Sequence, residues 1–372
     1  MKLATANSLA EIPAGAWDAL AGSSNPFVEH DFLLALETGH CLQPYGWQPH
    51  YLLVYSDDDE LIGAAPAYSK TNSYGEFVFD WAWADAYKRA QLSYYPKLVI
   101  AVPYSPITGP RLLAKNDDPQ IKKVLVEFAI AVAEKNNLSS VHWLFNRKSD
   151  HDVELDCGLL QRFDYQFHWH NQNYQHFDDF LAALSSKKRK NIKRERRKVQ
   201  EAGIRIETCI GSDLDEQQWR DVYNFYNITF MKKYGTATLS VEFFKAIAHK
   251  LLAILAYDGD RAVAGAICIL GENALYGRHW GCYEDYDSLH FEVCYYTGIE
   301  YCIDKGLQLF EPGAQGEHKI ARGFLPTQTW SAHWIAHPEF RRAIGDYLQR
   351  EAEAMADYGT ELNAASPYRD PA

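Results

Sequence analysis

Two similar hairpin patterns, one in each half of the chain, most constrain the fold. In the first half, an apolar run ending at Tyr55 is followed by an acidic turn and by an apolar run that contains Gly63-Ala64. In the second half, Tyr257 and Gly265-Ala266 stand at the same spacing, 202 residues later, and a short helical pattern precedes each hairpin. A match in the order of elements as well as in letters indicates an internal repeat. We therefore expect two similar α/β domains in tandem.

The length of the chain supports this division. With 372 residues, two domains with separate hydrophobic cores are expected. We place an N-terminal domain at 1–160, a C-terminal domain at 161–340, and a C-terminal helix with a loose tail at 341–372. In the N-terminal domain, the apolar runs at 77–79 and 97–102 are predicted to be strands. The expected fold class is α/β with mixed sheets.

The ends and the cysteines of the chain indicate its compartment. The N-terminus has no apolar signal segment, and no apolar run approaches the length of a membrane span. The seven cysteines are scattered and contain no CxxC pair, which is typical of free thiols in a reducing cytoplasm. His168 and His170 alternate along one predicted strand, but no third ligand is spaced to complete a metal site. We expect a cytoplasmic protein with no metal and no tightly bound cofactor.

Positive charge is concentrated in one predicted helix. Between Lys187 and Lys198 there are nine lysines or arginines and one glutamate, a local charge of +8, whereas the formal charge of the whole chain is −12. An acidic body with one basic helix is not typical of a DNA-binding protein, whose cations usually spread over a face. The cluster is either a solvated surface or a binding surface for an anion, with Lys190, Arg194 and Arg197 as candidates.

A glycine-rich segment at 311–324, with the sequence EPGAQGEHKIARGF, follows the apolar run Leu307-Gln308-Leu309-Phe310. Glycine permits a positive φ angle and a close approach of the backbone to a ligand. A strand, a glycine-rich turn and then charged residues are the usual order at the carboxyl edge of an α/β sheet, where ligands bind. The alternative is a solvated turn between a strand and a helix. The convergence of an acid, an imidazole and two cations favours a functional site.

Several stretches resemble the FemAB-like predicted N-acyltransferases, a family of peptidoglycan biosynthesis or recognition proteins in the GNAT acyltransferase superfamily. The order helix, hairpin, strand, helix, strand is also that of the GNAT fold. The 311–323 segment is the most specific part of the resemblance, which covers nearly the whole chain. The other matching stretches are 75–81, 94–98, 186–194, 277–281 and 289–296.

The resemblance implies two tandem GNAT-like domains and transfer of an acyl group from a small-molecule donor to an amine acceptor. It implies acyl-CoA as the donor. However, the position of the usual pyrophosphate loop of GNAT domains, 284–288, reads EDYDS, which is acidic and lacks glycine. The Fem ligases resemble this architecture and take an aminoacyl group from tRNA, so aminoacyl-tRNA is the alternative donor. A non-catalytic recognition module on the same fold is a further alternative.

Acyl transfer to an amine requires a base for the ammonium proton, donors for the oxyanion and an acid for the leaving group. The candidates for this chemistry are Glu311 at the end of the predicted strand, Glu292 near a helix start, and His318. Glu292 could instead stabilise its helix N-terminus, and His318 could be an ordinary surface imidazole.

The remaining candidates are binding residues. For the donor they include two cations three residues apart and two glycines of the glycine-rich segment: Lys319, Arg322, Gly313 and Gly316. For the acceptor they lie on a predicted strand, before a helix, and in the N-terminal domain: Arg278, Trp280, His290, Glu76, Asp80 and Lys97. Packing in the core is the alternative role of Trp280.

Overall fold

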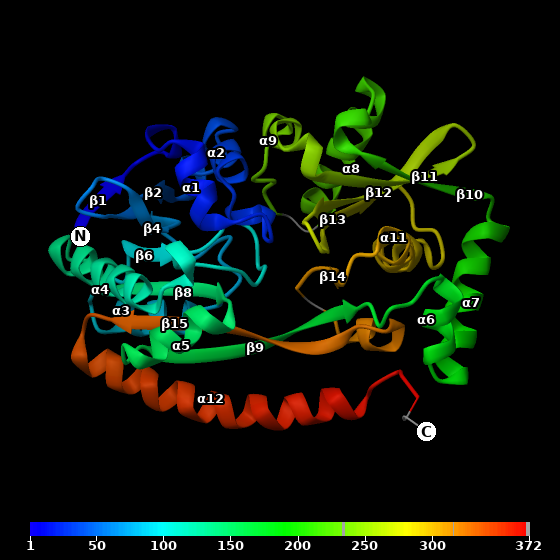
Figure 1. The fold of residues 1–372 in the computed structure, drawn as a ribbon. Helices are drawn as coiled ribbons and strands as arrows, with labels where there is room; N and C mark the ends of the chain where they lie inside the picture. The colour runs from blue at the N-terminus through cyan, green and yellow to red at the C-terminus, as the bar shows by residue number, and fades with distance from the viewer. Residues whose placement is uncertain (233–234, 315, 370–372) are drawn as a thin grey trace. The chain divides into compact units, whose positions relative to one another are not determined.

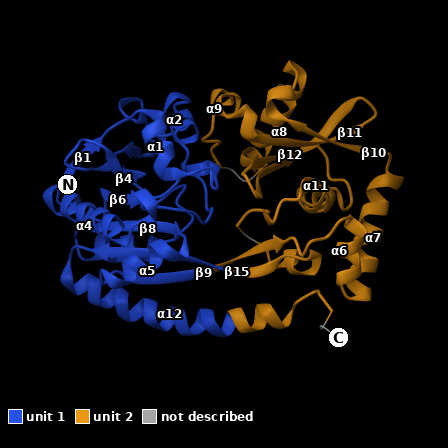
Figure 2. Ribbon diagram, in the orientation of Figure 1, with its two compact units in different colours: residues 1–164, 328–358 blue, residues 165–327, 359–372 orange. Residues whose placement is uncertain are grey.

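The computed structural model describes residues 1–232, 235–314 and 316–369 (Figure 1). The chain forms two compact units: unit 1 comprises 1–164 and 328–358, and unit 2 comprises 165–327 and 359–372 (Figure 2). Both are mixed α/β, which confirms the predicted fold class. Within the described ranges, every helix is too short or too polar to span a lipid bilayer.

Unit 1 contains one small sheet, in the order β1-β3-β4-β7, and a second group of strands in the order β15-β8-β6-β5-β2. In this second group β6 and β8 are parallel, and every residue of both strands is buried. The strands are β1 (Lys2–Ala6), β2 (Trp47–Pro49), β3 (Tyr51–Tyr55), β4 (Leu61–Ala65), β5 (Ala67–Lys70), β6 (Lys97–Ile100), β7 (Leu113–Ala114), β8 (Ser140–Asn146) and β15 (Leu325–Ile335). The helices are α1 (Ala14–Ala21), α2 (His30–Thr38), α3 (Trp81–Arg89), α4 (Pro119–Lys135), α5 (Lys148–Asp156) and α12 (Pro338–Ala364).

Helix α4 forms the crossover between the parallel strands β6 and β8. Asp118 caps its first turn by accepting a 2.8 Å hydrogen bond from the amide of Gln120, and Pro119 occupies the first helical position, where no amide hydrogen is needed. Leu125 and Ala129, four residues apart, are fully buried in the same core as Trp143 of β8. This apolar face fixes α4 on the sheet of unit 1.

Unit 2 has the strand order β10-β11-β12-β13-β14-β9. All neighbours are antiparallel except β13 and β14, which are parallel and are joined through helix α11. The strands are β9 (Leu160–His170), β10 (Ile204–Ile210), β11 (Leu251–Asp258), β12 (Arg261–Leu270), β13 (Ala274–Cys282) and β14 (Leu309–Glu311). The helices are α6 (Phe177–Ala183), α7 (Ser186–Glu201), α8 (Glu216–Lys232), α9 (Val241–Ala246), α10 (Leu289–Phe291) and α11 (Thr297–Lys305).

Strand β15 changes the boundary expected from the sequence. It pairs antiparallel with β8 of unit 1, with His333 opposite His142, and this pairing assigns the residues from Gln328 onward to unit 1. The expected 161–340 domain therefore differs from unit 2 at its end.

The tail after Gly359, which the sequence predicts to be loose, is instead ordered over the part that the structure describes. Helix α12 continues to Ala364, and Leu362 is buried. The amide of Ser185 donates to the carbonyl of Pro367, and the hydroxyl of Tyr368 donates to the carbonyl of Gly323 at 2.7 Å. Hydrogen bonds within unit 2 therefore anchor the C-terminal residues, although their polar composition does not indicate such contacts.

A second expectation, the strand at 77–79, is also wrong. These residues form an irregular segment between β5 and α3, and Phe77 has a positive φ of 61°. A left-handed backbone at a bulky residue interrupts a strand. Two buried acids on either side of Phe77, Glu76 and Asp80, turn inward and impose this path.

The Tyr368 contact generates a stability prediction. The substitution Tyr368→Phe removes one hydrogen bond to the Gly323 carbonyl and is expected to lower the free energy of unfolding of unit 2 by about 1 kcal/mol. Tyr347→Phe is the matched control, because its hydroxyl donates to Glu351 on an exposed surface. Chemical denaturation of both variants checks this, and an equal loss in the two would contradict the anchoring of the tail.

Candidate functional site

The candidate site lies where the parallel strands β13 and β14 of unit 2 part. Their pairing covers three residue pairs and ends at Tyr276 opposite Glu311. On its other edge β13 carries a β-bulge at Arg278, because Cys268 pairs with Gly277 and the preceding residue of β12 pairs with His279. Bulges bend a strand and re-aim side chains, and they are common beside active sites. The bulge and the end of pairing coincide at this point of the sheet.

A cavity of about 90 Å³ opens at the same place. It brings together three of the predicted acceptor-binding residues, Arg278, Trp280 and His290, and the rings of the last two lie 5.3 Å apart in an edge-to-face arrangement. The complete lining is Ala266, Cys268, Gly277, Arg278, His279, Trp280, His290, Cys294, Tyr295 and Pro312.

Glu311 ends β14 and is 3% exposed. Its Oε2 lies 3.7 Å from Nε2 of His168 on β9. Burial lowers the pKa of His168 to about 3, so this imidazole is neutral at physiological pH. Burial also lowers the pKa of Arg278, to about 10, although the Glu311 carboxylate opposes the shift. Glu311 therefore has a neutral imidazole beside it and a protonated guanidinium in its electrostatic field.

His168 is a site residue that sequence reasoning considered only as a metal ligand. Its alternation with His170 indicated one face of a strand, but the partner across the sheet could not be identified from that pattern. In the structure β9 pairs antiparallel with β14, with Trp169 opposite Phe310, and this register places His168 beside Glu311. Among the described residues no cluster of His, Cys, Asp and Glu is arranged to hold a metal ion.

The glycine-rich segment folds over the end of β14. Gly313 and Gly316 have φ angles of 95° and 114°, which side chains other than glycine rarely adopt. A short 3₁₀ helix (Glu317–Arg322) follows. Lys319 is buried there, and its Nζ donates to the carbonyl of Gly313 at 2.6 Å. Burial lowers the pKa of Lys319 to about 8.

Arg322, predicted to bind the donor, also points inward. Its Nη1 donates to the carbonyl of His318 at 2.9 Å, and its Nη2 lies 2.8 Å from Oε1 of Glu195 on α7. The guanidinium carbon lies 3.4 Å from the ring centroid of Phe291, a cation–π contact. A donor phosphate would have to replace these contacts.

His318 is an exposed residue whose ring nevertheless has a partner. Its Nε2 lies 2.8 Å from the hydroxyl of Tyr295. Partial burial, followed by the nearby charges of Arg322 and Lys319, lowers the pKa of His318. The lowered pKa favours the neutral imidazole, which can donate a hydrogen bond to the Tyr295 hydroxyl or accept one from it.

Glu292, the third candidate for catalysis, forms an ion pair. It begins a π-helical turn (Glu292–Tyr296) between α10 and α11 and is 6% exposed. Arg196 of α7 donates through Nε to both of its carboxylate oxygens, at 3.1 and 3.2 Å, and also lies 2.7 Å from Oε2 of Glu300. Burial raises the pKa of Glu292, with Arg196 opposing the shift. In the structure Glu292 docks α7 on the turn.

The loop at 284–288, which the family resemblance matches to the pyrophosphate loop of GNAT domains, is acidic. Its carboxylates contact protein cations: Glu284 lies 3.7 Å from Arg261, and Asp287 lies 2.6 Å from Lys198 of α7. A loop with three acidic side chains repels a pyrophosphate rather than binding it.

Helix α7 divides its residues between two faces. Ile192 and Val199 are buried against unit 2. On the opposite face Lys190, Arg194 and Arg197 are exposed, with the i, i+4, i+7 spacing of one helical stripe. Within the described ranges none of the three forms an ion pair, so their charge is available to a partner. Figure 1 shows α7 beside α6 at the edge of unit 2.

A larger groove of about 730 Å³ lies along α6, α7 and α11. Cationic and acidic side chains both line it, and one pair, Lys193 and Asp178, is 3.3 Å apart. Arg196 stacks on Phe177 at 4.5 Å. The lining is His176, Phe177, Asp178, Leu181, Lys193, Arg196, Arg197, Gln200, Glu300 and Asp304.

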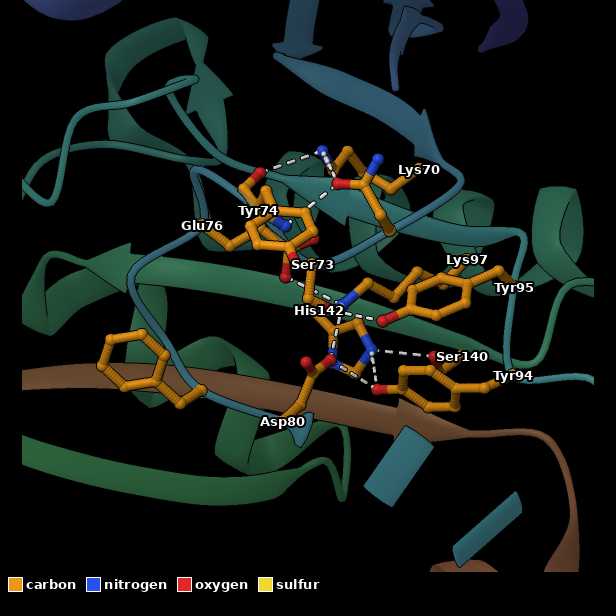
Figure 3. A network of polar contacts seen from close by, with 12 residues as sticks. Lys70, Ser73, Tyr74, Glu76, Asp80, Tyr94, Tyr95, Lys97, Ser140 and His142 are labelled. Atoms are coloured by element: carbon orange, nitrogen blue, oxygen red, sulfur yellow. Dashed lines mark hydrogen bonds and ion pairs between the residues drawn. The ribbon is translucent and has the colours of Figure 1, made fainter. Parts of the chain in front are cut away.

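Three acceptor candidates of the N-terminal half meet in a buried network of unit 1 (Figure 3). The Nζ of Lys97 lies 2.8 Å from Glu76 and 2.5 Å from Asp80, and it donates to Ser73 at 2.8 Å. Burial lowers the pKa of Lys97, but the two carboxylates outweigh it and the net shift is upward. Burial raises the pKa of Glu76 to about 7 against the attraction of Lys97.

The network continues through a tyrosine into two histidines. The hydroxyl of Tyr94 donates to Asp80 at 2.6 Å and lies 3.2 Å from His142. Nδ1 of His142 in turn lies 2.7 Å from Nδ1 of His333 on the neighbouring strand β15. Burial lowers the pKa of both imidazoles well below the usual value. Two neutral imidazoles can share this short contact, with one ring donating and the other accepting.

The segment that supplies the two acids exposes aromatic rings outward. Four side chains at 74–81 are between 40% and 69% exposed: Tyr74, Phe77, Phe79 and Trp81. Acidic side chains are usually exposed and aromatic rings are usually buried, so this segment reverses the usual pattern. The structure thus separates the candidate residues, with Glu76, Asp80 and Lys97 in unit 1 and Arg278, Trp280 and His290 in unit 2.

The chain belongs to the FemAB-like family, described as peptidoglycan biosynthesis/recognition, whose model matches residues 8–370. This confirms the family resemblance. No curated protein matches the sequence.

Solved structures share the fold at low sequence identity. FemX is 10% identical with a TM-score of 0.57, covering 93% of this chain and 100% of FemX. The C-terminal domain of a putative lysylphosphatidylglycerol synthetase from Agrobacterium fabrum is 10% identical with a TM-score of 0.56, covering 91% of this chain and 96% of that one. L-PGS from Bacillus licheniformis is 9% identical with a TM-score of 0.54, covering 90% and 96%.

The network of unit 1 generates a prediction. Lys97→Met leaves two buried carboxyls without their cation and is expected to cost about 3–5 kcal/mol of stability at neutral pH. Lys115→Met is the control and should cost under about 1 kcal/mol, because its pair with Glu60 is solvent-exposed.

The pH dependence follows from the same pair of acids. Without Lys97, the folded-state pKa of Glu76, already raised in the wild type, rises further, and that of Asp80 rises above its unfolded value. The variant therefore binds protons more tightly when folded and loses more stability than the wild type as the pH rises. The stability difference from wild type should therefore be larger at pH 8 than at pH 5. Denaturant titrations at both pH values measure it, and a difference independent of pH would contradict a charge-based role.

Proposed function

We propose that this chain is a transferase that moves an aminoacyl group from tRNA to an amine, with the chemistry at the parting of β13 and β14 in unit 2. The proposal is supported above all by the position of Glu311. It is a buried acid at the open end of a parallel strand pair, beside a cavity and a glycine-rich segment. The carboxyl ends of such strands are where α/β folds bind ligands.

The residues around Glu311 supply the chemistry that the reaction needs. The acceptor ammonium loses a proton to the Glu311 carboxylate, and the free amine attacks the ester carbonyl, so that a C–N bond forms and the carbonyl oxygen becomes an oxyanion. Arg278, protonated at neutral pH, stabilises that negative charge. As the intermediate collapses, the C–O bond to the tRNA ribose breaks, and the ribose oxygen takes the proton held by Glu311, which becomes a carboxylate again. The attacking nitrogen releases its second proton to solvent and becomes a neutral amide.

The charge distribution supports aminoacyl-tRNA over acyl-CoA as the donor. The acidic loop at 284–288 opposes a coenzyme A pyrophosphate at the usual GNAT position. The exposed stripe of Lys190, Arg194 and Arg197 suits a phosphate backbone. Cations that neutralise phosphates release the counterions condensed on the nucleic acid, and this release favours binding. Acyl-CoA remains the alternative donor, and both are included in the assay below.

The proposed acceptor is an amine carried by a peptidoglycan precursor. The description of the family supports this class of acceptor. Trp280 and His290 offer an aromatic wall and an imidazole beside Arg278, which suits an acceptor with both apolar and polar groups. In unit 1, Lys97 pairs with both Glu76 and Asp80. We propose that these residues hold the aromatic 74–81 segment in shape as an acceptor-binding surface of that unit.

Substitution of Glu311 tests the proposal. Glu311→Gln keeps the shape and removes the charge, so folding should survive while the single-turnover rate falls by roughly 10²–10⁴-fold, the usual range for a general base. The measurement is transfer of a labelled amino acid from charged tRNA to an amine-bearing peptidoglycan precursor, with labelled acetyl-CoA in parallel. Glu317→Gln, on an exposed residue of the same segment, is the control. Near-normal turnover with a strongly lowered melting temperature would show that Glu311 stabilises the fold and does not act as the base.

The basic face of α7 is tested by charge reversal. Changing Lys190, Arg194 and Arg197 together to Glu should weaken tRNA binding and reduce the slope of log affinity against log salt by about 2–3, since each lost phosphate contact removes roughly 0.7–0.9. Fluorescence anisotropy with labelled tRNA at several salt concentrations measures both effects. The control reverses three exposed cations of unit 1, Lys88, Lys123 and Lys135. Equal effects in the two triple variants would show that tRNA binding depends on the net charge of the protein and not on the position of the α7 stripe.

A further inference from the structure

The single acidic residue within the basic cluster is Glu195, and it faces the protein rather than solvent. Its side chain is 16% exposed, whereas the neighbouring cations of the outer stripe are exposed. We propose that Glu195 is a positioning residue that ties helix α7 to the glycine-rich segment and thereby holds the reacting groups in register with a donor bound on α7. This inference rests on the proposed function.

Both carboxylate oxygens of Glu195 are used, each by a different element. Oε1 lies 2.8 Å from Nη2 of Arg322, which ends the 3₁₀ helix of the glycine-rich segment. Oε2 accepts a short hydrogen bond from the hydroxyl of Tyr296, in the π-helical turn. One side chain of α7 therefore joins the two segments that flank the site. Hydrogen bonds to a charged group are stronger and more directional than neutral ones.

The Glu195–Arg322 pair adds a charged contact to a segment that is bounded by two glycines. Gly316 precedes the 3₁₀ helix and Gly323 follows it, both with positive φ, so the backbone at its two ends has little intrinsic stiffness. Arg322 compensates by bonding back to the carbonyl of His318. With Glu195 in place, the guanidinium has a fixed position, and so does the turn that carries His318 and Lys319.

The π-helical turn provides a second link between the same elements. The hydroxyls of two consecutive tyrosines bond to different segments. The hydroxyl of Tyr295 bonds to His318 of the glycine-rich segment, and that of Tyr296 bonds to Glu195 of α7. π-helical turns are rare in proteins as a whole, and those that occur are often found at functional sites. Helix α7, the turn and the glycine-rich segment thus form a closed loop of contacts, in which Glu195 is the member on the donor side.

The role requires a negative charge rather than only a side chain of the right length. Arg322 is 9% exposed, and the carboxylate that it contacts is that of Glu195. A guanidinium in such a setting needs a counter-charge. Glu195→Gln keeps the size and one acceptor oxygen but removes that charge, so it isolates the proposed contribution.

The test uses the full chain with Glu195→Gln and, as a matched control, Glu201→Gln on an exposed position of the same helix. Hydrogen–deuterium exchange is followed at the amides of Gly323 and Phe324, which bond to the carbonyls of Ile320 and Lys319. We expect roughly 10- to 100-fold faster exchange at these two amides in Glu195→Gln and no change in Glu201→Gln, because a lost charged hydrogen bond has about that effect on local opening.

Kinetics supply a second readout. In Glu195→Gln the rate of transfer from charged tRNA should fall by roughly tenfold or more while the affinity for tRNA stays within about twofold, because Glu195 does not face the bound anion. The pair is rebuilt with opposite polarity in the double variant Glu195→Arg with Arg322→Glu, which should recover part of the slow exchange.

The outcomes separate the inference from the proposed function. Unchanged exchange at 323 and 324 in Glu195→Gln overturns the inference, and so does faster exchange spread evenly over strands β11 and β12, which would mark a general loss of stability. If the wild-type chain transfers nothing from either donor, the proposed function fails, and the exchange pattern alone decides whether Glu195 ties α7 to the glycine-rich segment.

Discussion

The structure of unit 2 depends on a strand pairing that stops early. β13 and β14 share three residue pairs, and the backbone hydrogen bonds end at Tyr276 and Glu311 although β13 continues to Cys282. A parallel pair buried in a sheet normally continues, because unpaired backbone groups are costly. The bulge at Arg278 and the glycines after Glu311 make the separation possible, and the cavity, Glu311 and the glycine-rich segment all depend on it.

Two buried lysines, Lys97 of unit 1 and Lys319 of unit 2, have pKa shifts in opposite directions. In unit 1, Lys97 is enclosed by two carboxylates, and its pKa is raised despite complete burial. In unit 2, Lys319 has a carbonyl as its partner, and burial lowers its pKa to about 8. A fully paired cation fixes a structure, whereas a cation near its neutral point can exchange a proton. Lys97 is therefore held as a charged structural group, whereas Lys319 lies closer to its neutral form.

Sequence patterns predicted what local rules determine and missed what packing determines. The hairpin repeat and the glycine-rich segment identified the α/β units and the neighbourhood of Glu311, because turn residues and strand alternation are local properties. Helix α8 was missed, although it packs against β12 and β13, because its apolar residues are diluted by polar ones. It lies so close to β13 that a side chain at Gly281 would collide with the backbone of Phe225. The inward turn of Arg322 was equally invisible, because its partner Glu195 lies 127 residues away in the sequence.

The π-helical turn has a consequence for changes in chain length. Such a turn holds one residue more than an α-helical turn over the same span. Loss of one residue between 292 and 296 would restore an ordinary α-helical turn over that span and leave the later side chains of α11 in their places. Within the turn, Tyr295 and Tyr296 could then no longer reach opposite neighbours together. The additional residue is therefore a requirement of these two contacts, whereas helix α11 could form without it.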